Sequence, residues 1–243
     1  MKYYLIMQYF PEFNFIAPLS VKVHTINTVM MAMEPQASLG CFDSSLSKIL
    51  EFVGKELFGD LTEEKKVAAI IKKTPEAAKT VAFSLLELLS SHMSKNLVCD
   101  TISGLLKTAV AAKSAFEALQ KLRKAIKSVQ AGLARNKDLE RPTDYLQLSY
   151  GILSEQLLPA GVMKSHTATL KEFAFSLLLS GTSDVVVTGS QARQFWPVLR
   201  DGLENKDVNV VIACLKFLSN ITQTKEVCDV LVSQLFRTNA VNT

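Results

Sequence analysis

The sequence predicts an all-α protein, and two features of its composition lead to this fold class. Glycine (10 residues) and proline (7 residues) are scarce in the 243-residue chain, whereas a β-sandwich or barrel needs turn residues every 8 to 12 positions. Hydrophobic residues make up 48% of the chain, which excludes a disordered or collagen-like protein. From residue 43 onward, apolar residues recur every three or four positions, as in amphipathic helices.

The first predicted helices have recognisable starts. Asp43 is placed to cap one helix, Asp60 and Glu63 form a capping box for the next, and Thr74–Glu76 combines a capping hydroxyl, a first-turn proline and a carboxylate. Ser94 is a further capping residue. The helices that follow these starts carry apolar stripes over residues 46–57, 67–71, 81–89 and 97–110.

The next helix carries a heptad stripe, in which apolar residues alternate spacings of four and three. Such a stripe is typical of a coiled coil, but it covers fewer than three heptads and its flanks are basic. We therefore favour a face that packs against helices of the same chain and keep self-association as the alternative. The stripe consists of Ala115, Leu119, Leu122, Ile126, Val129 and Leu133.

The second half of the chain continues the helical pattern. Helices are expected to begin at Thr143, after Ser165, at Asp207 and at Thr224, and another either begins or bends at Pro197. The single β-like run, 185–187, has no second strand to pair with. Helix pairs that recur at roughly 40 residues are typical of helical repeat arrays.

The expected domain organisation is an irregular, aromatic-rich leader over residues 1–42 and a single helical-repeat domain over 43–243. The most polar connection within that domain lies near 135–143. No apolar run approaches the roughly 20 residues that a membrane-spanning helix needs, so we expect no membrane partner. The leader makes a poor signal peptide, because its short apolar run is followed by Pro11 and Glu12.

Positive charge is concentrated in residues 107–141. The whole chain has a net charge of +4, while this basic band holds nine basic and three acidic residues. A solvated helix face, a protein-binding surface and, less strongly, a phosphate-binding surface remain open interpretations, and no aromatic residue lies among the basic residues at 121–127 to stack on bases. The candidate partner-binding residues of the band are Lys121, Arg123, Lys124 and Lys127.

Motifs for chemistry are missing from the sequence. The three histidines are scattered, the four cysteines lack the close spacing of a zinc site, and no glycine-rich phosphate-binding loop is present. We therefore predict a protein that is not an enzyme and that uses no metal or cofactor. The sparse cysteines indicate reduced thiols and an intracellular location, nuclear or cytoplasmic.

The strongest family resemblance lies near the C-terminus. The stretch Asp207–Ile221 resembles the last helix of an armadillo or HEAT repeat, and Trp196–Leu203 resembles its companion helix. The resemblance implies a right-handed α-solenoid of paired antiparallel helices with a concave groove for protein partners, and hence a non-catalytic scaffold. Arg193, Trp196 and Arg200 are candidate groove contacts, although Trp196 beside Pro197 equally suits a core position between repeats.

A narrower resemblance covers residues 145–235, whose overall sequence character is similar to that of the meiosis inhibitor protein 1 family. This resemblance implies a scaffold that acts in meiotic recombination, where DNA double-strand breaks form. It also implies that the chain is a fragment or short isoform of a longer solenoid. The alternative function is a nucleic-acid-associated helical repeat that uses the basic band at 107–141.

Overall fold

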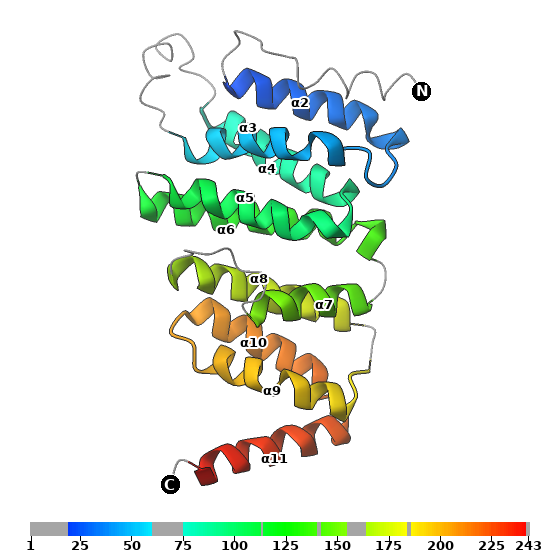
Figure 1. The fold of residues 1–243 in the computed structure, drawn as a ribbon, viewed down its shortest axis with the longest axis vertical. Coiled ribbons are helices and arrows are strands. Elements are labelled where there is room, and N and C mark those ends of the chain that lie inside the picture. The colour runs from blue at the N-terminus through cyan, green and yellow to red at the C-terminus, as the bar shows by residue number, and fades with distance from the viewer. Residues whose placement is uncertain are drawn as a thin grey trace. The chain divides into compact units, whose positions relative to one another are not determined.

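The computed structural model describes residues 19–59, 75–112, 114–139, 142–154, 164–183 and 186–241. Within these residues the structure contains helices and no strand, which confirms the all-α prediction (Figure 1). The α-helices are α2 (Leu19–Met33), α3 (Leu46–Phe58), α4 (Pro75–His92), α5 (Val98–Val110), α6 (Ala115–Leu133), α7 (Pro142–Leu153), α8 (Lys164–Thr182), α9 (Gly189–Leu203), α10 (Val208–Ile221) and α11 (Lys225–Val241). Short 3₁₀ segments cover Glu34–Gln36, Asp43–Ser45, Lys95–Leu97 and Lys137–Leu139.

The chain divides into two compact units, Met1–Leu139 and Glu140–Thr243. The division falls inside the polar connection at 135–143 that the sequence singles out. Unit 1 contains α2 to α6 and unit 2 contains α7 to α11. Each unit is built from helices that pack side by side, as expected for a helical repeat protein.

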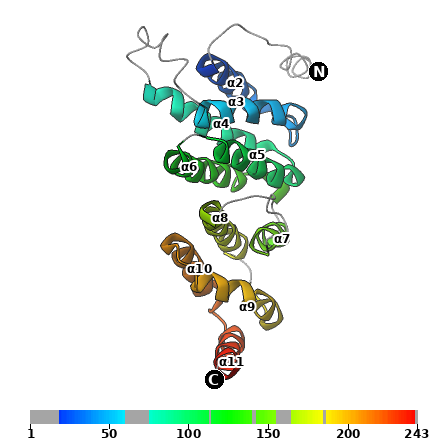
Figure 2. The ribbon, with the colours of Figure 1, turned by 60° about the vertical axis from the view of Figure 1, so that its left-hand side comes forward.

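Unit 1 has two layers of helices (Figure 2). In one layer α4 packs against both α2 and α6, and its contact with α6 is the most extensive in the unit. In the other layer α3 packs against α5. Contacts between α3 and α4, and between α5 and α6, join the layers. The core between them is filled by aliphatic side chains and by Phe42, which is 1% exposed.

Unit 2 repeats this arrangement. Helix α7 packs against α8, α9 packs against α10, and the pairs are joined through contacts of α8 with α10 and of α9 with α11. Three phenylalanines form the centre of this core. The ring centroid of Phe217 lies 5.9 Å from that of Phe195 and 6.3 Å from that of Phe175.

The structure corrects the expected irregular leader for its second half. Residues 19–33 form helix α2, because Val23, Ile26, Met30 and Met33 recur every three or four positions and are buried. Residues 1–18 lie outside the described residues. The helix predicted over 67–71, with its capping box at Asp60 and Glu63, also lies outside them.

Helix α6 buries its apolar stripe inside unit 1. The packing face favoured by the sequence is therefore observed, but it is rotated relative to the predicted heptad stripe: Ala115 is exposed and Leu119 half-buried, whereas Ala118 and Ala125 are buried. The buried positions Ala118, Ala125 and Gly132 lie on one side of α6, and their small side chains suit a close approach of α4. A Cβ atom built on Gly132 would lie 2.1 Å from the carbonyl oxygen of Glu87.

Several predicted helix boundaries agree with the structure. Helix α4 begins at Pro75, and Asp207 caps α10 by accepting a hydrogen bond from the backbone N–H of Asn209 at 2.9 Å. Asp43 does not cap its own helix, because its carboxylate instead accepts hydrogen bonds from the backbone N–H and hydroxyl of Ser94. Helix α9 does not begin at Pro197, which lies inside it.

Candidate interaction surfaces

Helix α6 presents the predicted basic residues on its outer side. Lys124 and Lys127 are exposed, and Lys121 and Arg123 flank them half-buried. Because α-helical residues turn by about 100° each, Lys124 and Lys127 lie only about 60° apart around the axis. The opposite side of the helix is anchored in the core by Leu122, which is fully buried. We call Lys121, Arg123, Lys124 and Lys127 the α6 basic surface.

The two lysines in the middle of this surface have no neutralising partner nearby. Among the residues that the structure describes, no carboxylate forms an ion pair with Lys124 or Lys127. The one acidic residue of α6, Glu117, lies about two turns before Lys124. The α6 basic surface therefore has a positive potential that a phosphate or an acidic segment could meet.

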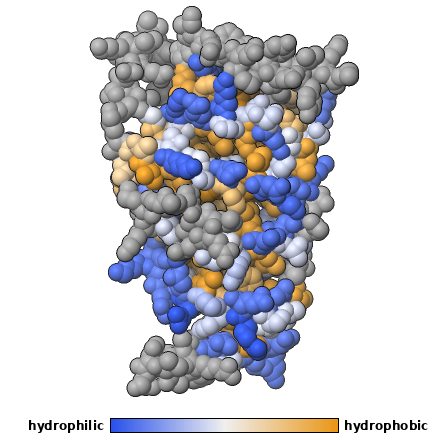
Figure 3. Space-filling model, viewed as in Figure 1, coloured by the Kyte–Doolittle hydropathy of each residue, from blue (hydrophilic) through white to orange (hydrophobic). Residues whose placement is uncertain are grey.

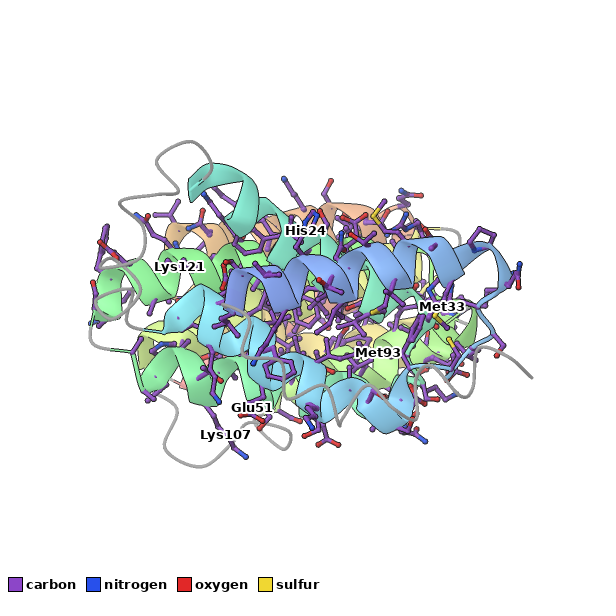
Figure 4. The ribbon with its side chains drawn as sticks, turned by 90° about the horizontal axis from the view of Figure 1, so that it is seen from above. His24, Met33, Glu51, Met93, Lys107 and Lys121 are labelled. Carbon is purple, nitrogen blue, oxygen red and sulfur yellow. The ribbon has the colours of Figure 1, made fainter. Side chains whose placement is uncertain are left out.

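Two further basic residues of the predicted band, Lys107 and Arg135, differ from this surface in position or pairing. Lys107 lies on α5 and points to a different side of unit 1 from Lys121 (Figure 4). Arg135 forms an ion pair with Glu87 at 2.9 Å, which offsets its charge. Lys113 and Arg141 lie outside the described residues. Among the described residues of the band, the α6 basic surface is the part that lies on one helix face.

Helix α9 in unit 2 carries the second set of predicted contacts. Arg193 and Arg200 are exposed and Trp196 is half-buried between them. Their spacings of three and four residues place all three on one side of the helix. The sequence left Trp196 open between a groove contact and a core position, and its half-buried side chain is compatible with both. We call Arg193, Trp196 and Arg200 the α9 ridge.

The N-terminus of α9 is held firmly, which fixes the α9 ridge. Thr188 and Gln191 form a capping box: the Thr188 side chain accepts from the Gln191 backbone N–H, and the Gln191 side chain accepts from the Thr188 backbone N–H. The carboxylate of Glu226 on α11 accepts a further hydrogen bond from the Gly189 backbone N–H at 3.0 Å. The capping box is visible in the sequence, whereas the contact with Glu226 is not.

Sequence reasoning missed a third surface, on α10. Val208, Ile212 and Leu215 recur at the helical spacing of the predicted helix that begins at Asp207, yet they are 68%, 45% and 49% exposed. The residues that α10 buries are Val210, Ala213, Cys214, Phe217 and Ile221. Figure 3 shows that hydrophobic residues are interspersed with hydrophilic ones on the face it draws, so hydropathy alone does not single out this helix. We call Val208, Ile212 and Leu215 the α10 apolar face.

Reactive groups do not gather at any of these surfaces. No group of histidine, cysteine and carboxylate side chains suited to a metal ion occurs among the described residues. Burial, together with the nearby charge of Asp201, raises the pKa of the Cys214 thiol to about 12. This thiol donates a hydrogen bond to the Leu199 carbonyl oxygen, 3.6 Å from Sγ. None of the described helices is both long enough and apolar enough to cross a membrane.

Comparison with known families identifies a relationship that the sequence analysis did not reach. The family model described as the U3 small nucleolar RNA-associated protein 20 (UTP20) domain matches residues 17–153, which is more than half of the chain. The match spans α2 to α7 and includes the α6 basic surface. A helical repeat protein is thus supported, whereas the resemblance to meiosis inhibitor protein 1 and the meiotic role drawn from it find no support.

Proposed function

The chain belongs to the UTP20 domain family, and from that membership we propose that it is a non-catalytic helical-repeat scaffold in a nucleolar complex of protein and RNA. The observation that carries this proposal is the family match itself, which covers all the described helices of unit 1. Stacked helices of this kind present long exposed side-chain rows that suit extended partners. The α9 ridge offers such a row, with arginine and tryptophan, which are enriched at binding hot spots.

A second candidate function is direct RNA contact through the α6 basic surface. Three observations favour it: the surface lies within the matched region, Lys124 and Lys127 are exposed, and no carboxylate in the described part of the chain pairs with them. Lysine ammonium groups bind phosphates without reading sequence. No aromatic residue lies between Lys121 and Lys127, although Phe116 at the start of α6 is 72% exposed. Phosphate contact is therefore the interaction that these lysines themselves offer.

The scaffold proposal is tested by recovering the tagged full chain from nucleoli and measuring the U3 small nucleolar RNA that accompanies it. We expect enrichment of U3 RNA over an unrelated small RNA. The double variant Lys124→Glu/Lys127→Glu is compared with Lys206→Glu/Lys225→Glu, which changes the same charge at exposed lysines of unit 2. Enrichment that survives in both variants supports a scaffold held by protein contacts. Lack of enrichment with the unaltered chain contradicts the nucleolar proposal.

Direct RNA contact has its own measurement. The purified chain is titrated with a U3 transcript at several salt concentrations. The binding constant K is expected to fall as the salt concentration rises. If Lys124 and Lys127 each neutralise one phosphate, the double variant makes the plot of log K against log salt less steep by about 1.4 to 1.8. The Lys206→Glu/Lys225→Glu control keeps the slope of the unaltered chain. An equal slope for all three proteins contradicts the second candidate.

A further inference from the structure

Helix α10 has apolar residues on two sides, and the described residues bury only one of them. Val210 and Phe217 are fully buried, and both lie roughly opposite the α10 apolar face around the helix axis. Val208, Ile212 and Leu215 lie within about 60° of one another, so they form one straight row along the helix. Two half-buried residues, Val211 and Leu218, border this row. The exposed Ser219 lies on the same side one turn after Leu215, so the apolar row is limited to these two turns of the helix.

The arrangement of unit 2 shows which side of α10 has no neighbour among the described helices. The pair α9 and α10 follows the pair α7 and α8, and α10 packs against α8. Helix α11 then packs against α9 and extends the row of α9 by one helix. Among the described helices, α10 has extensive contacts with α8 and α9 alone, and no further helix extends the row that α8 and α10 form. The α10 apolar face lies on the side away from its core, where that row would continue.

From this geometry we propose that the α10 apolar face is a docking site for an amphipathic α-helix of a partner protein, which packs on α10 as α10 packs on α8. The inference rests on the proposed scaffold function and adds the class of partner and the surface that holds it. A docked helix presents apolar residues at spacings of three and four, the pattern that matches a helical row. It continues an interface that the structure already contains.

Charge specifies the partner further. Lys216 is exposed beside the α10 apolar face and is the sole charged residue of α10, which contains no aspartate or glutamate. The complementary helix therefore carries an acidic residue next to its apolar stripe. A second copy that pairs through its own α10 offers no acidic side chain from that helix to Lys216. Charge complementarity thus favours a partner protein over a second copy.

The test uses a defined probe, a fluorescein-labelled stapled peptide of about four helical turns. Its leucines recur every three or four residues with glutamates beside them, and a second version replaces each glutamate with lysine. We expect the acidic peptide to bind the full chain with a Kd of about 10–100 µM. Ile212→Glu should weaken this binding at least tenfold. Lys216→Glu should weaken the acidic peptide several-fold and strengthen the lysine peptide, a reversal that a misfolded variant cannot produce.

A matched control and three outcomes decide the proposal. Val21→Glu changes an equally exposed valine on α2 (47% exposed) and should leave peptide binding unchanged. Absence of saturable binding to the unaltered chain overturns the proposal, as does equal binding to the Ile212→Glu variant. Analytical ultracentrifugation that finds a dimer dissolved by Ile212→Glu also overturns it, in favour of a second copy. Recovery of U3 RNA is measured separately, so failure of peptide docking alone leaves the nucleolar scaffold standing.

Discussion

The side-chain amide of Asn136 donates a hydrogen bond to the backbone carbonyl of Met93 at 2.8 Å, and a second one to the carbonyl of Ser90 at 2.7 Å. These carbonyls belong to the C-terminal end of α4, where the last turn lacks intrahelical partners. Unit 2 contains the same device, because the amide of Asn220 donates to the carbonyl and hydroxyl of Thr182 at the end of α8. In each unit an asparagine near the end of one helix thus binds the end of its neighbour in the same layer.

We expect Asn136→Ala to destabilise the protein by about 1–3 kcal/mol, because it leaves buried carbonyl groups without a donor. Asn136 is itself buried, at 3% exposure, so water cannot readily replace its amide. The measurement is the free energy of unfolding from urea titration of the full chain. Asn96→Ala removes an exposed asparagine of unit 1 and serves as the control, with an expected change within about 0.5 kcal/mol. Equal stability of the two variants would contradict a structural role for Asn136.

Helix starts were accessible from the sequence because capping is a local interaction. Pro75 and Asp207 act within one helical turn, and the structure places helix starts at both. The bond between Asn136 and the end of α4 spans more than 40 residues. No local pattern indicates it, and in the sequence Asn136 is simply one polar residue of a polar connection. Long-range polar contacts of this kind become visible only once the helices are placed.

Gly132 provides the second prediction, because α4 and α6 approach each other closely at this residue. A Cβ atom there would lie 2.1 Å from the Glu87 carbonyl oxygen and 2.6 Å from the Cβ atom of Ser90. Gly132→Ala should therefore push the helices apart and destabilise the protein by about 1–3 kcal/mol. The measurement is the midpoint and free energy of urea unfolding of the full chain.

Gly104 on α5 is the matched control, because a Cβ atom built there meets no heavy atom within 4 Å. Gly104→Ala should stabilise the protein by about 0.5–1 kcal/mol, since alanine has the higher helix propensity. The two substitutions are chemically identical and should shift stability in opposite directions. A Gly132→Ala variant that is as stable as the unaltered chain would show that the α4–α6 contact is looser than the structure indicates.

The α10 apolar face shows why a buried side cannot always be read from a sequence. Periodicity identifies a buried side by contrast between polar and apolar positions. Helix α10 has apolar residues on both sides, so both Val208–Ile212–Leu215 and Val210–Cys214–Phe217 satisfy the helical spacing. Burial assigns the second set to the core. The α6 basic surface was easier to predict, because four basic residues contrast sharply with the buried Leu122.

His166 gives a prediction about how the stability of the fold depends on pH. His166 on α8 is 2% exposed, and burial lowers its pKa below the ordinary value for histidine. Between the lowered pKa and the ordinary one, the unfolded chain binds the proton and the folded chain does not. The stability that the neutral, buried His166 contributes is therefore fully present above the ordinary histidine pKa of about 6.5. It is lost progressively as the pH falls below that value.

Urea unfolding at pH 7.5 and at pH 5.5 checks this sign. The unaltered chain should lose more stability on acidification than the His166→Gln variant, because glutamine does not titrate. His24→Gln, which makes the same substitution at an exposed histidine of α2, is the matched control. A steeper loss of stability in the His166→Gln variant would show that the histidine is protonated in the folded protein.

Cys214 gives the last prediction, which concerns thiol reactivity. The thiolate is the reactive form of cysteine, and a pKa of about 12 leaves Cys214 with roughly a thousandfold less thiolate at pH 8 than an ordinary thiol. Cys214 is also fully buried, whereas Cys228 on α11 is half-buried. Iodoacetamide followed by peptide mass spectrometry should therefore modify Cys228 in the folded chain well before Cys214. Both should react alike in urea, and rapid modification of Cys214 under native conditions would mean that α10 separates readily from α8 and α9.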